Sequence, residues 1–235
     1  MAPRGFGALP TLAPGVRHTE RVAVQSPPEL LALHAVRIMG MSDVAGIGRR
    51  FDLDADLVEE LMLDDEACGW VQRVGFQDQV GWGLTISGRV ENERRLAAEL
   101  DACGQRGEIE AAHRDFAALN AAFLKAMTNW QIRPTSWDAM AENDHGDWRW
   151  DERVLDSLAS LRRRVEPIAV RLAEALARFD GYGARLDDAL QQVDHGRRQY
   201  VDGVGIDSCH VVWFELHEDL LATLGIDRSA ADRRV

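Results

Sequence analysis

Apolar residues recur along most of this chain at spacings of three and four, the period of an amphipathic α-helix. The first such stripe predicts a helix that ends at Gly40 and consists of Leu30, Leu31, His34, Ala35, Ile38 and Met39. A shorter helix is expected over 44–51, after the capping pair Ser42 and Asp43. A third helix is expected over about 55–67, with Asp54 or Asp56 as its cap.

Two short runs follow the third helix, WVQRV and GWGLTI, and they predict two strands joined by a turn at 75–79. A charged helix is then expected over 88–104. Two longer helices come next, and their apolar residues keep a seven-residue repeat. Such seams fit either a helical bundle or a coiled-coil-like interface between two copies of the chain. Further helices are expected over 186–193 and 209–225.

This order of elements predicts a mainly α fold in two parts. Three helices and a two-stranded hairpin are typical of a winged helix-turn-helix, so we assign 27–104 to such a domain with its linking helix. Residues 105–235 are assigned to a C-terminal helical bundle for ligand sensing and dimerisation. Residues 1–26 are rich in proline and glycine without periodicity, and they are expected to form a disordered leader.

The second strand runs directly into LTISGR. A strand that ends in Leu-Thr-x-x-Gly-Arg before a charged helix resembles the MarR and PadR groups of bacterial winged-helix regulators. The matching positions are Leu84, Thr85, Gly88 and Arg89, and the resemblance covers about 27–104. The segments NDHGDWRWD and VDGVGIDSCHVVWFELHEDLLATLG are similar to the C-terminal part of actinobacterial proteins labelled transcriptional regulators. The resemblance implies a homodimer whose third helices enter successive major grooves of DNA.

The charge of the chain changes this picture. The formal net charge is −12, from 27 basic and 39 acidic residues. Residues 28–104 hold seven arginines and fifteen acidic residues, a formal charge of −8. The run from Asp52 to Glu66 contains eight carboxylates and no basic residue. Because phosphate contacts come from cations or backbone N–H groups, acids on the third helix would repel DNA.

Two arrangements reconcile this charge with the predicted fold. In the first, Arg37, Arg49, Arg50 and Arg73 flank the groove and bind phosphates, while the acids turn aside. In the second, the winged helix no longer binds DNA and holds a protein partner through its third helix.

Aromatic side chains gather in the loop 130–150, which contains Trp130, Trp137, Trp148 and Trp150 beside His145. These tryptophans either close the end of the bundle or form the walls of a pocket for a small effector. On the last helix, a stripe at steps of three and four contains His210, Phe214 and His217. We expect an aromatic or acyl effector to bind these eight residues.

Metal binding and catalysis find less support. His210 and His217 could join Asp207 in a zinc or iron site, but they lie two turns apart, about 10 Å at ~1.5 Å per residue. Cys209 and His210 point about 100° apart, which does not suit a hydrogen-bonded nucleophile and base. We therefore predict no catalytic residue, no metal and no cofactor. Three cysteines without a CxxC pair, and no membrane-length apolar run, indicate a cytoplasmic protein that does not enter a membrane.

The sequence thus predicts a ligand-responsive transcriptional regulator that binds DNA as a homodimer. The alternative is an accessory or regulatory subunit that does not bind DNA and docks an enzyme through its acidic winged helix. A stand-alone enzyme is the third class.

Overall fold

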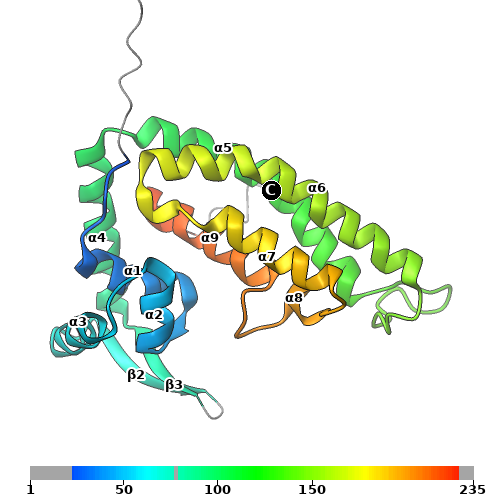
Figure 1. Cartoon of the computed structure of the whole chain (residues 1–235), viewed down its shortest axis with the longest axis horizontal. Helices are drawn as coiled ribbons and strands as arrows, with labels where there is room; N and C mark the ends of the chain where they lie inside the picture. Colours follow the sequence, from blue (N-terminus) through cyan, green and yellow to red (C-terminus); the bar gives the residue numbers. More distant parts are fainter. Residues whose placement is uncertain (1–22, 77–78, 228–235) are drawn as a thin grey trace, which may run out of the picture.

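The computed structural model describes residues 23–76 and 79–227, and it is mainly helical with a small antiparallel sheet (Figure 1). The first part contains α1 (Pro28–Met39), β1 (Met41–Ser42), α2 (Val44–Phe51), α3 (Ala55–Ala67), β2 (Val71–Phe76), β3 (Gln79–Leu84) and α4 (Ile86–Cys103). The second contains α5 (Arg106–Gln131), α6 (Trp148–Ala175), η1 (Ala177–Phe179), α7 (Tyr182–Asp194), α8 (Gln199–Asp202) and α9 (Cys209–Leu224). The predicted mainly α class is confirmed.

The first part is built on the three-stranded sheet, in the order β1-β3-β2. β2 and β3 form the expected hairpin, and β1 adds a third strand that the sequence did not predict, with Met41 opposite Gly83. Trp82 of β3 is almost fully buried in a cluster with residues of α1, α2 and α3. This core fixes the three helices on the sheet.

Local capping explains where most of these helices begin. Asp43 and Asp54 accept backbone N–H groups at the starts of α2 and α3, and Thr85 accepts the Gly88 N–H at the start of α4. Ser26, which precedes Pro27, Pro28 and Glu29, is the residue that the sequence predicts as the cap of α1, and this prediction is wrong. Pro27 occupies the N-cap position, and the Ser26 hydroxyl donates to Glu99 of α4 instead.

The predicted leader falls mostly outside the described residues, because 1–22 are not described. Val24, within that leader, pairs with Leu176 in an isolated parallel bridge. Val24 therefore lies against the second part of the chain, whereas Ser26 contacts α4 of the first part.

The second part contains the long antiparallel pair α5 and α6, with α7, α8 and α9 along one side (Figure 1). Trp213 of α9 stacks on Phe123 at 4.3 Å and lies 4.8 Å from Phe116, both on the seam of α5. The seven-residue seams therefore close a core within one chain. They are therefore not evidence for an interface between two copies, and the homodimer stays a prediction. None of the described helices has the length and apolar content needed to cross a bilayer.

α9 joins the two parts of the chain. It contacts α1 and α4 on one side and α5, α7 and α8 on the others. Leu30 of α1, Leu96 of α4 and Ala222 of α9 form a small buried cluster. The first part is thus held on the helical part by a shared core.

The space around Gly88, three residues after the cap Thr85, admits no side chain. A Cβ atom at this position would lie 1.8 Å from the Trp70 carbonyl oxygen and 2.7 Å from Leu84 Cδ2. We expect Gly88→Ala to lower the free energy of unfolding by more than about 3 kcal/mol, because backbone must move to admit the methyl group. Urea unfolding followed by circular dichroism measures this.

Gly107→Ala in α5 is the matched control, because a Cβ there meets nothing within 4 Å. It should be neutral or stabilise the protein by up to about 1 kcal/mol. Equal effects of the two substitutions would contradict the packing explanation.

Candidate functional site

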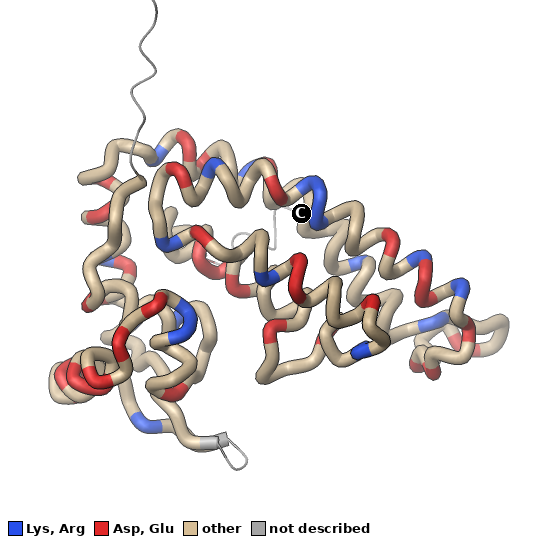
Figure 2. Tube along the Cα trace, viewed as in Figure 1, with Lys and Arg blue, Asp and Glu red and all other residues tan. Residues whose placement is uncertain are grey.

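α3 presents an acidic face to solvent. Val58, Met62 and Asp65 point into the protein. The exposed side chains include Asp56, Glu59, Glu60, Leu63 and Asp64. No Lys or Arg occurs on this helix, and Figure 2 shows α3 at a corner of the molecule with all of its charged positions acidic. Its surface is therefore negative, with one exposed leucine.

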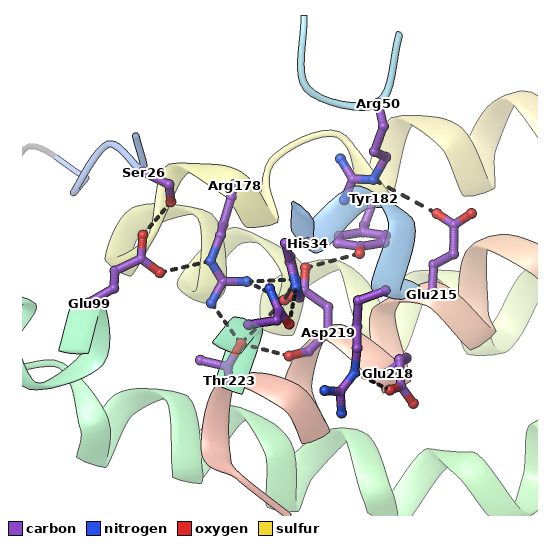
Figure 3. A network of polar contacts seen from close by, with 12 residues as sticks. Ser26, His34, Arg50, Glu99, Arg178, Tyr182, Glu215, Glu218, Asp219 and Thr223 are labelled. Atoms are coloured by element: carbon purple, nitrogen blue, oxygen red, sulfur yellow. Dashed lines mark hydrogen bonds and ion pairs between the residues drawn. The ribbon is translucent and has the colours of Figure 1, made fainter. Parts of the chain in front are cut away.

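Two of the four arginines predicted to bind DNA lie inside the protein. The Arg37 guanidinium donates to Glu218 of α9 and to Glu93 of α4, each at 2.8 Å. The Arg50 guanidinium lies 3.8 Å from Glu215 of α9 and 4.4 Å from the ring centre of Tyr182 (Figure 3). Both side chains are about 95% buried. In this arrangement neither reaches a DNA phosphate.

The other two predicted arginines remain on the surface. Arg49 is exposed at the end of α2. Arg73 of β2 is exposed and stacks on Trp82, with 3.6 Å between its guanidinium carbon and the ring centre. Arg89, at the family-like Gly-Arg pair, is half exposed and lies 3.6 Å from Glu218. The first part thus offers few cations to a polyanion.

A buried polar network, which the sequence did not reveal, lies where α1, α4, η1, α7 and α9 meet (Figure 3). Arg178 forms ion pairs with Asp219 and, at 2.9 Å, with Glu99, and it donates to Thr223 at 2.7 Å. Asp219 also lies 3.0 Å from His34 Nε2 and accepts from the Tyr182 hydroxyl at 3.1 Å. The side chains of His34, Arg178 and Asp219 have no exposed surface.

Burial alone would raise the pKa of Asp219, but Arg178 and His34 outweigh it and hold that pKa well below its usual range. Burial also raises the pKa of the Tyr182 hydroxyl, so this group stays protonated and donates. The network is therefore a set of matched charges without access for a substrate.

A second cluster fixes the start of α9. Arg185 of α7 donates to both carboxylate oxygens of Asp207 at 2.8 Å and to Glu215 at 2.7 Å. The hydrogen bonds from Arg185 lower the pKa of Asp207. Asp207, considered for a metal site with His210 and His217, is thus an ion-pair partner. Within 23–76 and 79–227, no group of three or more metal-binding side chains is arranged around one point.

The predicted effector residues separate into several environments. Trp130 is buried and packs 4.4 Å from His145, and the Trp150 indole N–H donates to the Asn129 carbonyl at 2.6 Å. Trp137 and Trp148 are exposed. The loop thus contributes one small cluster and two outward tryptophans.

The predicted effector residues of α9 also differ in their exposure. His217 is buried, with its ring 5.5 Å from Phe116, whereas Phe214 is partly exposed beside His210. An open hollow of about 880 Å³ lies between α6 and α7, near Arg162, Glu166, Phe179 and Asp187. None of the eight predicted effector residues lines this hollow.

Comparison with known proteins yields no match to a family model, to a curated protein or to a solved structure. The resemblance to MarR and PadR regulators at Leu84, Thr85, Gly88 and Arg89 therefore stays a prediction.

Removal of Arg178 tests the importance of the buried network. We expect Arg178→Met to lower the free energy of unfolding by about 3–5 kcal/mol at pH 7, because Asp219 and Glu99 would stay buried without their cation. Arg94→Met is the control, since it breaks only the exposed pair with Glu91. It should lower the free energy of unfolding far less than Arg178→Met does, because the Arg94 side chain is exposed.

The pH dependence of this loss gives a second check. In the wild type, the depressed pKa of Asp219 contributes stability above about pH 4, which is lost as the pH falls through the folded-state pKa. In Arg178→Met, protonation of Asp219 removes a buried charge that has lost its arginine partner. The stability difference between the two proteins should therefore shrink from pH 7 to pH 4 in urea unfolding, and a constant difference would contradict the assignment.

Proposed function

We propose that this chain is a regulatory or accessory subunit that docks a partner protein through the acidic face of α3. The element order α1-β1-α2-α3-β2-β3, with sheet order β1-β3-β2, supports a winged helix-turn-helix for the first part. In that fold the third helix is the element presented to a macromolecule. α3 is the third helix of the first part, and much of its surface is exposed.

The inward placement of Arg37 and Arg50 is the observation that carries the proposal. These cations neutralise acids of α4 and α9, so they are not available to offset the acids of α3. Glu59, Glu60 and Asp64 face solvent and would repel a phosphate backbone. A basic protein surface with a depression for Leu63 is the complementary partner.

DNA binding as a homodimeric transcriptional regulator is the second candidate. The exposed Arg49 and Arg73 favour DNA binding, because both belong to the first part of the chain, as α3 does. The resemblance at Thr85, Gly88 and Arg89 favours it as well. An effector for either function stays a proposal, with the loop 130–150 as its expected place.

A charge-neutral face of α3 tests the docking proposal. The variant Glu59→Gln, Glu60→Gln, Asp64→Asn is compared with the wild type as tagged full chains expressed in the native host. We expect a stoichiometric partner to be recovered with the wild type and reduced at least about tenfold with the variant, from three lost contacts of up to about 1 kcal/mol each. Quantitative mass spectrometry measures the recovery.

The matched control changes the net charge equally but on exposed acids of α5 and α6, through Glu110→Gln, Glu152→Gln and Asp156→Asn. It should recover the partner as the wild type does. Equal losses in both variants would overturn the assignment to α3.

Gel retardation with the gene's own upstream DNA at low salt separates the two candidates. We expect no retardation at micromolar protein. Retardation that disappears in Arg49→Ala, Arg73→Ala would favour the DNA-binding regulator instead.

A further inference from the structure

His145 lies in an unusual backbone conformation between α5 and α6, at the end of the molecule away from α3 (Figure 1). Its φ is +56°, in the left-handed region that side chains other than glycine rarely adopt. The Asn143 side-chain oxygen accepts the His145 N–H at 3.1 Å and stabilises this turn. Such conformations cluster at functional sites, because the surrounding structure must hold them in place.

A buried carboxylate orients the His145 ring. Nδ1 lies 3.0 and 3.1 Å from the two oxygens of Asp151, which is 4% exposed in the first turn of α6. The Asn143 amide donates to Asp151 Oδ1 and to the Trp130 carbonyl oxygen, each at 2.9 Å. Both amide hydrogens are thereby used, so Nδ1 donates its own proton to Asp151. The lone pair of the imidazole is then on Nε2.

The other ring nitrogen is available to a reagent. The His145 side chain is 27% exposed. Within the described part of the chain, Nε2 of His145 makes no hydrogen bond. The buried polar atoms that lack a partner do not include it, so Nε2 reaches the surface. One face of the ring packs on Trp130. A fixed ring with a bound Nδ1 and an open Nε2 is suited to nucleophilic attack.

Two guanidinium groups lie beside carboxylates of the His145 turn and of Asp151. Arg198 lies 3.8 Å from Asp151 Oδ2 and is 55% exposed. Arg133 lies 3.6 Å from Asp144 and 3.7 Å from Asp147, the residues on either side of the His145 turn, and its Nε has no partner. These loose pairs leave N–H groups free. Guanidinium groups match the oxygens of a phosphoryl group in geometry and charge.

We propose that His145 is a nucleophile that accepts a phosphoryl group on Nε2. The Nε2 lone pair forms the N–P bond while the bond from phosphorus to the leaving group breaks, and the leaving group takes that electron pair. The Nδ1 proton stays on the ring, and Asp151 balances the positive charge that develops there. The substrate class is a phosphoryl donor with a good leaving group. The proposal is independent of docking through α3.

Phosphoramidate is the probe, because it transfers a phosphoryl group to imidazole and releases ammonia. The full chain is treated with it, and the phosphorylation rate of each histidine is followed by mass spectrometry. His195 is an internal control, since its Nδ1 is also held, at 2.6 Å, but by the Gln191 carbonyl oxygen and not by a carboxylate. We expect His145 to react at least about tenfold faster than His195, although His195 is more exposed.

Two variants test the roles of the neighbours. Asp151→Asn should bring the rate at His145 down to that at His195, while the His195 rate is unchanged and reports an intact fold. Arg198→Gln should slow phosphorylation of His145 but leave its acylation by diethyl pyrocarbonate unchanged. This second variant removes only a half-exposed side chain and keeps Asp151 in place.

Two kinds of result would contradict this role of His145. Equal rates at His145 and His195, or no effect of Asp151→Asn, would overturn the nucleophile assignment. Fast acylation of His145 without fast phosphorylation would show a reactive imidazole and overturn the phosphoryl assignment.

Discussion

The buried carboxylate of Asp219 is the interaction on which the arrangement of this molecule depends. An isolated charge in the interior is costly, and a buried carboxylate is stable only with matched partners. Its partners are Arg178 of η1, His34 of α1 and Tyr182 of α7. Arg178 and Tyr182 belong to the second part, and His34 is the partner that the first part supplies. The contact between His34 and Asp219 therefore fixes α1 against α9.

The same junction determines how the charges of the chain are divided. Arg37 and Arg50 turn towards α9, where they meet Glu218 and Glu215. Glu215 is also paired with Arg185, and Glu218 also lies 3.6 Å from Arg89. As a consequence the first part loses two of its seven arginines to the interior, and the acids of α3 face solvent without local compensation. The closed junction therefore contributes to the negative charge of the surface around α3.

Local features of the sequence predicted much of the first part. Asp43, Asp54 and Thr85 cap helices as their positions indicate, and the hairpin of β2 and β3 forms where two apolar runs flank a turn. β1 was not predicted because two residues carry no periodic pattern. A two-residue strand is defined only by its partner.

Long-range features were not predictable in the same way. From the sequence, the seven-residue seam of α5 could pack against a second copy of the chain or against another helix of the same chain. In the structure Trp213 of α9 covers this seam. Trp213 stacks on Phe123 and donates to Asn120, which is 93 positions away in the sequence. His34 occupies an apolar stripe, which signals a buried polar contact. Its partner Asp219 is 185 positions away, and no local rule identifies it. The direction of Arg37 and Arg50 depends on the same distant helix.

One helix physically connects the junction to the His145 turn. α6 carries Asp151 in its first turn, and Arg178 follows its last turn by three residues. A helix of 28 residues is about 42 Å long at ~1.5 Å per residue. A displacement at Asp151 could be transmitted to Arg178 only if the whole of α6 moved as a rigid body relative to α5 and α7. Coupling of that kind requires a second packing arrangement of similar energy. The close packing of Val165 and Leu172, both fully buried, favours a single arrangement, so we expect no coupling between the two ends of α6.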